Sequence, residues 1–531
     1  MTKRLAAGLS IALALALALV PAALAGQGAD NADAKVDAVF AKFSMTTPGC
    51  AVGVATGGKP VLAKGYGMAD LEHDVRISPD TIFEGGSVSK QFTAAAVMLL
   101  AREGRLSLDD QARKYIPELP DYGAPLTIRH MLNHTSGLRD WGNVAGIAGW
   151  PRTTRVYTHA HVLEIVSKQR STNFAPGTQW SYSNTGFNLA AIIVERVSGQ
   201  SFQAFTRERL FQPLGMTHTS WRDDYTRVVK GRAMAYSERD GFRTDMPFEN
   251  VYGNGGLLTT VGDLLKWNEH YDAPPPADAA MVGEQQKAGH FNDGRTHGYA
   301  LGLFVGMHMG LREIYHSGST AGYQAFLTRF PDQRVSVAVL CNVSNAQATA
   351  YAHAVADVFL GDRVKTVAPA PLPTVAELEA AAGLYRSLLT GVAVTIGRDA
   401  SVLRGRHWTF DGRGGAVAGD ESAAVSSSML PEHYERVPPA NYTDGQLAAL
   451  AGTYTSDEAE TALTAVVENH ALVLKRRPDV TITLTPTYAD AFTADHGLGT
   501  VIFRRDTAGK ITELSVIQDR VWDLRFVRAP R

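Results

Sequence analysis

The sequence predicts a mixed α/β (α+β) protein in which an antiparallel sheet flanked by helices is followed by β units. Its 531 residues are 45% hydrophobic and 20% charged, a composition typical of globular proteins, and the length suffices for about three domains. Helix-like and strand-like hydrophobic periodicities alternate as far as about residue 360, whereas strand-like runs dominate beyond residue 375. Together these observations indicate a mixed α/β body with β appendages.

The N-terminal segment, residues 1–25, is predicted to be a secretory signal peptide. A basic start at Lys3 precedes an uncharged apolar run over residues 5–20, and the small residues that end at Ala25 favour cleavage there. An uncleaved membrane anchor is the alternative, because the run and the residues after it are almost long enough to span a bilayer. We expect a secreted or periplasmic protein with no membrane span after signal cleavage.

Charge and cysteine content exclude several classes of protein. Without residues 1–25 the chain has 49 basic and 53 acidic residues, so no basic surface for nucleic acid or anionic membranes is expected. The two cysteines, Cys50 and Cys341, are too few for a disulfide scaffold, a zinc ribbon or an iron–sulfur cluster. In an exported protein two cysteines can still form one bridge.

Hydrophobic spacing predicts the elements of the α/β body in order. An amphipathic helix over residues 30–44 is followed by strands over 50–55 and 60–65, which the Gly57-Gly58 turn joins. The helix from Ser87 to about residue 102 is so apolar that it should be buried and central. Two strands that flank Pro331-Asp332 form a predicted hairpin. Further helices are predicted near residues 127–133, 159–168, 186–197, 201–210, 259–271 and 346–360.

The C-terminal third is predicted to hold two related β units. A Pro-rich linker over residues 363–374 ends the body, which spans 26–362. The stretch from Leu378 to Tyr385 recurs from Leu447 to Tyr454, and strand-like runs follow each copy. This repeat predicts one unit over residues 375–440 and a second over residues 441–531.

Ser87-Val88-Ser89-Lys90 is the first candidate for chemistry. Helical spacing places Lys90 on the same face as Ser87, and the helix N-terminus adds amide N–H groups beside the hydroxyl. A desolvated lysine is driven toward its neutral form, in which it can activate a serine nucleophile. The alternative is an N-cap serine beside a solvated lysine. We favour the catalytic interpretation because the helix that follows is too apolar for a surface element.

Two further segments carry side chains suited to acyl transfer. In Tyr182-Ser183-Asn184 the phenol can shuttle a proton and the amide can hold a substrate amide, although an aromatic plug with an Asn helix cap is the alternative. In His316-Ser317-Gly318-Ser319 the glycine would admit a substrate backbone, and His316 offers a cation or a donor opposite Tyr182. A histidine at a strand end beside a turn is the alternative there.

These segments together resemble the serine penicillin-recognising family, which includes β-lactamases, low-molecular-weight penicillin-binding proteins, D-aminopeptidases and related esterases. Ser-x-x-Lys, Tyr-x-Asn and a basic residue-x-Gly occur in the family's order, and the resemblance covers roughly residues 32–360. Subsidiary matches are His134-Thr-Ser-Gly-Leu138, Pro213-Leu-Gly-Met216 and Gly255-Gly-Leu-Leu-Thr-Thr260 with Asp263 and Trp267. The implied fold is the β-lactamase/transpeptidase-like sheet with a helical subdomain, here followed by lipocalin-like β units.

The resemblance also implies the roles of the site residues. Ser87 would be acylated, and Lys90, Tyr182 and His316 would complete the catalytic set. Substrate would be bound by Asn184, Ser317, Gly318 and Ser319. The backbone N–H groups of Ser87 and Ser319 would form the oxyanion hole. Because the family's strands that hold Cys50 and Cys341 are antiparallel neighbours, the resemblance implies a Cys50–Cys341 disulfide.

The expected function is that of an exported serine hydrolase acting through an acyl-enzyme on amides or esters. D-amino-acid-containing peptides (D-aminopeptidase-like or DD-carboxypeptidase-like) or small esters are the expected substrates, because the third motif has His316 where class C β-lactamases have lysine, and β units follow the body. A class C-like β-lactamase and a non-catalytic cell-wall-binding protein are the alternatives. The oligomeric state is left open.

No metal or cofactor is expected. The pair His159 and His161 has no third ligand nearby in the sequence. His130 and His134 lie at helical spacing and could form a metal face, but the resemblance makes His134 part of a structural loop.

Overall fold

The computed structural model describes residues 31–365, 374–397, 406–410, 415–420 and 431–530. The predicted signal peptide and residues 366–373 of the predicted linker lie outside the described residues. Within the described part of the chain, no helix has the length and apolar character needed to cross a bilayer.

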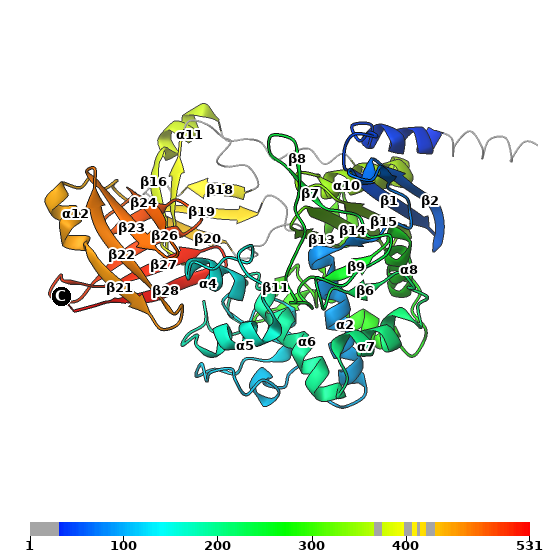
Figure 1. Cartoon of the computed structure of the whole chain (residues 1–531), viewed down its shortest axis with the longest axis horizontal. Helices are drawn as coiled ribbons and strands as arrows, with labels where there is room; N and C mark the ends of the chain where they lie inside the picture. Colours follow the sequence, from blue (N-terminus) through cyan, green and yellow to red (C-terminus); the bar gives the residue numbers. More distant parts are fainter. Residues whose placement is uncertain (1–30, 366–373, 398–405, 411–414, 421–430, 531) are drawn as a thin grey trace, which may run out of the picture.

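A six-stranded antiparallel sheet forms the centre of the α/β body, as the sequence predicts (Figure 1). Its strand order is β12-β13-β14-β15-β1-β2, so the N-terminal hairpin pairs with the last strand of the body. The bounds are β1 (Cys50–Thr56), β2 (Lys59–Tyr66), β12 (Phe304–His308), β13 (Leu311–Thr320), β14 (Tyr323–Phe330) and β15 (Val335–Cys341).

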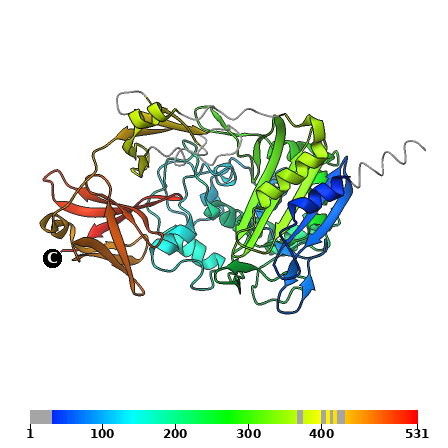
Figure 2. The ribbon, with the colours of Figure 1, turned by 90° about the horizontal axis from the view of Figure 1, so that it is seen from above.

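Both faces of this sheet are covered by helices, and the strands are therefore apolar on both sides. Along β15, Val337 and Val339 belong to one core cluster, whereas Ala338 and Leu340 belong to the other. The helix α10 (Ala348–Leu360) and the helical residues 31–39 cover the first face, where Figure 2 shows them lying across the strands. The other face packs against α8 (Val261–Asp272) and α2 (Lys90–Arg102).

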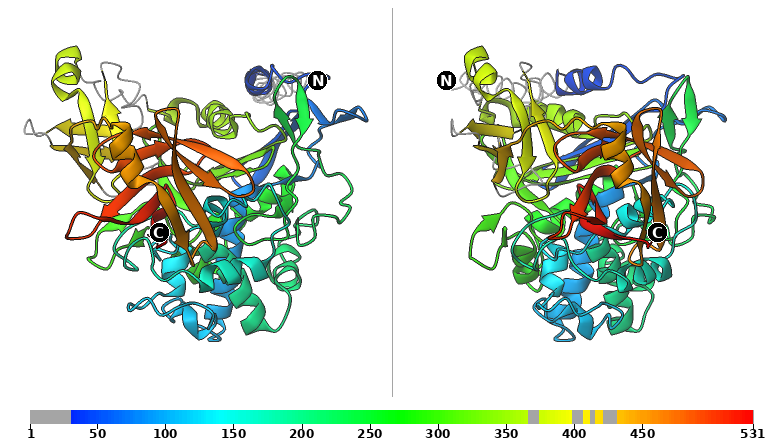
Figure 3. Two further views of the ribbon diagram at one scale, coloured as in Figure 1. Left: turned by 60° about the vertical axis from the view of Figure 1, so that its left-hand side comes forward. Right: turned by 90° about the vertical axis from the view of Figure 1, so that its left-hand side faces the viewer.

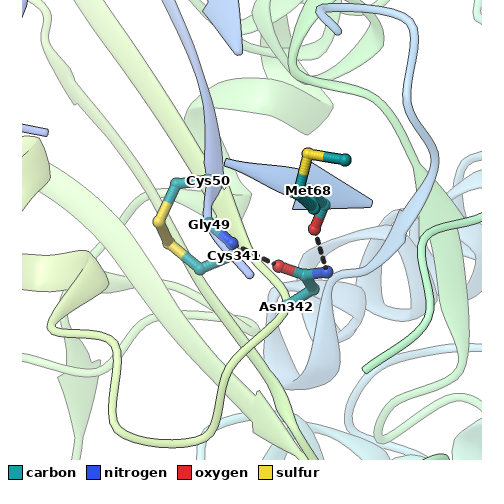
Figure 4. The surroundings of a disulfide bond; sticks show 5 residues. All are labelled: Gly49, Cys50, Met68, Cys341 and Asn342. Atoms are coloured by element: carbon teal, nitrogen blue, oxygen red, sulfur yellow. Dashed lines mark hydrogen bonds between the residues drawn. A yellow bond between two sulfur atoms is a disulfide. The ribbon is translucent and has the colours of Figure 1, made fainter. Parts of the chain in front are cut away.

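The Cys50–Cys341 disulfide is present, which confirms the expected pairing. The two cysteines stand directly opposite each other in the β1–β15 register, with their Cα atoms 4.0 Å apart. Beside the bridge, the Asn342 side chain accepts a hydrogen bond from Gly49 N and donates one to Met68 O (Figure 4). The bridge and the amide together fasten the start of the first strand to the end of the last.

The predicted buried helix lies at the centre of the body. A 3-10 turn, η1 (Gly86–Ser89), leads into α2, and every side chain from Lys90 to Leu100 is buried. The helix α2 packs against α6, and both belong to the larger core cluster. The remaining helical segments of the body are η2 (Ala112–Lys114), α3 (Ile128–Leu132), α4 (Trp141–Ile147), α5 (His159–Ser167), α6 (Asn184–Ser198), α7 (Phe202–Thr206), η3 (Arg207–Phe211), α9 (Ala279–Gln285) and η4 (Gly361–Arg363).

Short strands complete the body. Among them, β9 pairs with both β5 and β6 in a three-stranded sheet, and β5 directly precedes the turn that holds Ser87. Their bounds are β3 (Met68–Asp70), β4 (Val75–Arg76), β5 (Phe83–Glu84), β6 (Ser220–Trp221), β7 (Tyr236–Glu238), β8 (Phe242–Thr244), β9 (Leu257–Thr259), β10 (Gly289–His290) and β11 (Thr296–His297).

The two C-terminal units are both β-rich. The second is a closed eight-stranded barrel, as a lipocalin-like unit should be, whereas the described residues of the first form five strands in the order β17-β16-β20-β19-β18. Both lie on the same side of the α/β body (Figures 1 and 3). The first unit comprises α11 (Val375–Ala381), β16 (Gly383–Ser387), β17 (Ala393–Ile396), β18 (Arg406–Phe410), β19 (Gly415–Asp420) and β20 (Glu432–Arg436). The second comprises α12 (Asp444–Leu450), β21 (Gly452–Ser456), β22 (Thr461–Glu468), β23 (Ala471–Arg476), β24 (Val480–Pro486), β25 (Ala491–Ala494), β26 (Gly499–Arg505), β27 (Ile511–Gln518) and β28 (Val521–Arg528).

The sequence repeat corresponds to a structural repeat. In each unit a capped short helix leads into the first strand, and the strand's tyrosine, Tyr385 or Tyr454, donates to the backbone carbonyl four residues upstream. An arginine from the last described strand of each unit, Arg436 or Arg528, covers that tyrosine ring at 5.6 or 5.7 Å. The two units are therefore variants of one building plan.

The barrel is docked on the α/β body through α4. Val144, Ile147 and Ala148 pack into the same apolar cluster as the interior of the barrel. Arg476 and Arg477 of the barrel donate hydrogen bonds to backbone carbonyls at the end of that helix. Apolar burial and hydrogen bonds thus fix the barrel in one position relative to the body.

Candidate active site

Ser87 lies in the 3-10 turn that leads into α2, where two glycines bring it close to β13. Gly86 has a φ of +50°, and a Cβ there would lie 2.6 Å from Ser319 N. A Cβ on Gly318 would lie 2.0 Å from Gly85 O and 3.1 Å from Ser87 N. Only residues without a Cβ allow this approach. It brings the backbone N–H groups of Ser87 and Ser319 to the same place.

Lys90 is fully buried, and its amine lies among three oxygen atoms. Nζ is 3.0 Å from Ser87 Oγ, 2.9 Å from Asn184 Oδ1 and 2.6 Å from Asn254 O. A neutral amine has two N–H bonds and one lone pair. The amide and backbone oxygens of Asn184 and Asn254 can only accept, so they take the two N–H bonds. The lone pair is then directed at the Ser87 hydroxyl, as a general base requires.

The surroundings of Lys90 favour that neutral form. Burial lowers the pKa of Lys90 well below that of an exposed lysine, and the positive charge of Arg520 lowers it further. Two weaker effects follow: Asp140 raises the pKa of Lys90, and Arg152 lowers it. A lowered pKa increases the fraction of Lys90 that is neutral near pH 7, and the neutral amine can act as a base.

Tyr182 lies on the other side of the Ser87 hydroxyl. Its phenol shares a hydrogen bond with Ser87, and its ring is 4.8 Å from Lys90 Nζ. Burial raises the pKa of Tyr182, while the Ser87 hydroxyl and the nearby Arg520 lower it in part. The resting phenol is therefore protonated, which leaves it with a proton to donate.

Asn184 begins α6 and holds both the lysine and the loop before it. Its Oδ1 accepts from Lys90, and its backbone N–H donates to Asp140 Oδ2 at 2.7 Å. The amide N–H₂ can donate to a substrate carbonyl, and the second lone pair of Oδ1 can still accept from a substrate N–H.

His316 lies in the site, where the sequence suggested either a cation or a hydrogen-bond donor. Burial lowers the pKa of His316 to about 3. Its Nδ1 lies 2.6 Å from the backbone oxygen of Ser317, and its Nε2 lies 2.9 Å from the hydroxyl of Tyr299. With Nδ1–H donating, Nε2 accepts from the phenol. The imidazole is therefore neutral, and both nitrogens already have partners.

Arg520 places a cation beside Tyr182 that the sequence did not predict. Its guanidinium carbon lies 4.8 Å from the centre of the Tyr182 ring, at cation–π distance. Arg520 belongs to the tip between β27 and β28 of the barrel. Its backbone oxygen accepts from Asp140 N and from the side chain of Asn173, which holds the tip against the α/β body. No local pattern around Arg520 marks it, because its position depends on how the barrel docks.

Tyr299 and His134 are further residues that the sequence did not assign to the site. Burial raises the pKa of Tyr299 well above its usual value, so its hydroxyl remains the donor to His316. The ring centre of His134 lies 4.2 Å from that of Tyr182 and 4.5 Å from that of Tyr299, with the ring planes tilted, and its Nδ1 accepts from Ser183 N. The expectation that His134 belongs to a structural loop agrees with these contacts.

One histidine of each pair that the sequence singled out belongs to a helix cap. His130 and His161 each complete a capping box with the threonine three residues earlier. His159 Nε2 contacts the backbone of Tyr252. Within the described residues, neither pair belongs to a group of three ligand-type side chains close enough to share an ion.

Ser87 opens into a cleft of about 1850 Å³ whose walls come from all three parts of the chain. The α/β body contributes Tyr182, Asn184 and the predicted binding residues Ser317 to Ser319. The first β unit contributes residues near Leu388 and Tyr434, and the barrel contributes residues 517–520 and Trp522. The C-terminal units therefore form part of the active-site wall.

Comparison with known proteins agrees with this geometry. The family model described as Beta-lactamase matches residues 24–359. A D-aminopeptidase of Brucella anthropi is 26% identical over 88% of this chain and 93% of its own length. A D-aminopeptidase of Gluconobacter oxydans is 27% identical over 81% and 83%. An octameric penicillin-binding protein homologue from Pyrococcus abyssi shares the fold, with a TM-score of 0.55 and 22% identity over 94% of this chain and 99% of its own.

The match spans more than half of the chain and includes all three motifs. Ser87, Lys90, Tyr182 and Asn184 lie together, and Ser87, Tyr182 and Asn184 line one cleft. The chain belongs to the beta-lactamase family and is a serine hydrolase.

Proposed function

We propose that the chain hydrolyses D-amino-acid amides and short peptides that contain D-residues, through an acyl-enzyme on Ser87. Support comes from two D-aminopeptidase relatives that align over most of the chain, including the C-terminal units. The observation that carries the proposal is the Ser87 hydroxyl between a buried lysine and a buried tyrosine. The cleft above it has room for more than one residue of a peptide.

Acylation follows from these positions. Neutral Lys90 accepts the Ser87 proton as Oγ bonds to the substrate carbonyl carbon. The carbonyl oxygen becomes an oxyanion, which accepts hydrogen bonds from Ser87 N and Ser319 N. Tyr182 donates its proton to the leaving amine as the carbon–nitrogen bond breaks, and Lys90 returns a proton to the phenolate. Asn184 keeps Lys90 oriented throughout.

Deacylation reverses the roles with water in place of the amine. A water molecule attacks the Ser87 ester, and the Lys90–Tyr182 pair accepts its proton. The second oxyanion uses the same two N–H groups, and the proton returns to Ser87 Oγ when the acid product leaves. Since the same groups serve both steps, one site is enough for the whole cycle.

A substrate panel tests the proposal. D-alanine amide, D-alanine p-nitroanilide, their L-enantiomers, an acetylated D-Ala-D-Ala peptide, a p-nitrophenyl ester and nitrocefin would be assayed with the wild type and Ser87→Ala. We expect kcat/KM for the D-amides to exceed that for the L-amides at least ten-fold, with no turnover by Ser87→Ala. Turnover of nitrocefin with none of the amides would instead identify a β-lactamase.

We also propose that the protein is exported. The pattern over residues 1–25 and the disulfide agree with an oxidising compartment. N-terminal sequencing of the protein expressed from its full gene in a Gram-negative host should find a start directly after Ala25. An intact Met1 on the active protein would contradict this.

A further inference from the structure

A second group of chemically active side chains lies on the opposite face of the main sheet from Ser87. It comprises His308 at the end of β12, Glu313 near the start of β13, and His353 and Asp357 on α10. Glu313 shares its face of β13 with Tyr315, which belongs to the α10 core cluster, whereas Ile314 belongs to the other cluster. The group is therefore separate from the hydrolase site, although it uses the same strand.

These side chains are already arranged in pairs. His353 Nε2 lies 2.8 Å from Glu313 Oε1, and His308 Nε2 lies 2.8 Å from Asp357 Oδ1. The two imidazole rings stack at 4.1 Å with an angle of 16° between their planes. His353 and Asp357 are one helical turn apart, so α10 presents them on the same side. The ligand atoms of His308, Glu313 and His353 all lie within 4.8 Å of one another.

The spacing fits a small divalent ion. Nitrogen and oxygen ligands lie about 2.0–2.2 Å from zinc, so neighbouring ligands of a tetrahedral site are roughly 3.3–3.5 Å apart. The two imidazole–carboxylate pairs, at 2.8 Å, are closer than this, so the carboxylates must move back for an ion to enter between them and the imidazoles. Asp357 pairs with His308 and is the most exposed member of the group. His353 also lines the cleft, which gives an ion a path from solvent.

The electrostatics favour an ion as well. The Glu313 carboxylate is 1% exposed and also accepts a hydrogen bond from Thr328 Oγ1. Among the described residues, its only ion-pair partner is His353. An imidazole carries a charge only when it is protonated, whereas a buried carboxylate needs a positive partner throughout. A divalent cation would neutralise both carboxylates while binding neutral imidazoles.

We propose that His308, Glu313, His353 and Asp357 bind a divalent transition-metal ion, with zinc as the best match. Two imidazole nitrogens and two carboxylate oxygens suit zinc or its first-row neighbours better than magnesium or calcium, which prefer oxygen ligands alone. The ion would tie the β12–β13 hairpin to α10. This site could not be predicted from the sequence, because the two histidines are 45 residues apart, outside any short motif.

Calorimetric titration of the full chain tests the proposal. After treatment with EDTA and dialysis, Zn²⁺ is added to the wild type, to His308→Ala/His353→Ala and to His73→Ala. The last variant is the matched control, since His73 forms an exposed group with Asp70 and Glu72. We expect one zinc per chain for the wild type and the control. The double variant should bind at least ten-fold more weakly and lose the zinc-dependent rise in Tm.

Asp357→Asn is a second variant that keeps the shape of the group. It should weaken zinc binding while leaving the circular dichroism spectrum unchanged. Equal zinc affinity in the wild type and in the folded double variant would overturn the proposal, as would loss of binding in His73→Ala alone. Because the readout is metal affinity, its failure would not affect the hydrolase proposal.

Discussion

Lys90 is the residue on which the chemistry depends, and its protonation should control the rate. Burial lowers its pKa, so the enzyme should be active near neutral pH and lose activity as pH falls through that pKa. The acid limb of kcat/KM should fall ten-fold per pH unit, as for a single protonation. Lys90→Arg keeps a permanent cation and should reduce kcat/KM by about 10³-fold. A flat acid limb, or full activity in Lys90→Arg, would contradict the role of general base.

His316 should make the fold sensitive to acid. In the unfolded chain a histidine binds a proton near pH 6.5, whereas burial lowers the pKa of His316 in the folded chain to about 3. The unfolded state therefore binds more protons below pH 6.5, and the free energy of unfolding falls as the pH drops toward 3. Between pH 7 and pH 5 this residue alone should lower it by about 2 kcal/mol.

Urea unfolding at the two pH values measures this effect. His316→Gln should show a smaller loss of stability at pH 5 than the wild type does. His470→Gln is the control, because that imidazole is on the surface. Identical pH dependence in the wild type and His316→Gln would show that His316 is not a buried neutral group.

At the scale of the elements, η1 and β13 approach each other closely beside Ser87. In the proposed mechanism this approach forms the oxyanion hole. A Cβ on Gly318 would collide with Gly85 O, so Gly318→Ala should push β13 away from Ser87 N. We expect kcat to fall about 10²-fold, the usual effect of losing one oxyanion donor. Gly283→Ala is the control, since an added Cβ there meets nothing. Unchanged kcat in a folded Gly318→Ala would show that the backbone N–H groups of Ser87 and Ser319 do not stabilise the oxyanion.

The elements that the sequence predicts best are those with strong local patterns. The buried helix after Ser87 and the β14–β15 hairpin are where periodicity placed them. The motif residues Ser87, Lys90 and Tyr182 converge because the helix start and the loop before α6 meet at β13. In contrast, α4 was not predicted, and its seven residues divide their apolar side chains between two cores. Trp141 and Ala145 pack in the α/β body, whereas Val144 and Ile147 pack against the barrel.

Because local sequence patterns do not show tertiary contacts, some residues of the site were not predicted. Tyr299 and Arg520 act through partners that are distant in sequence, so no motif surrounds them. For His316 a cation and a donor were both left open, because sequence alone does not show how deeply a histidine is buried or what its nitrogens contact. Tertiary packing determines both the burial of His316 and the contacts of its nitrogens.

At the scale of the whole molecule, the barrel contributes directly to the active site. Arg520 should help to keep Lys90 neutral, since its charge lowers the pKa of that lysine. Arg520→Ala should therefore shift the acid limb of kcat/KM to higher pH, whereas Arg520→Lys should largely restore it. Arg505→Ala is the control, because that barrel arginine pairs with Asp490 away from the cleft. The same acid limb in Arg520→Ala and wild type would show that the barrel tip does not tune the site.

The docking of the barrel also explains why the C-terminal units belong to the enzyme rather than to a separate module. Both units contribute to the cleft wall, and the barrel shares an apolar cluster with α4. A substrate must therefore fit between surfaces from opposite ends of the chain. Substrate size should be set by these units as much as by the α/β body.

The most direct test of the central claim is intact-protein mass spectrometry after brief incubation with a penicillin or a slowly hydrolysed D-amino-acid ester. Because Ser87 lies between a base and a proton donor, the wild type should gain the mass of one acyl group, and peptide mapping should place it on Ser87. Ser87→Ala should gain none. A folded wild type that stays unlabelled, or a label on another residue, would contradict the account.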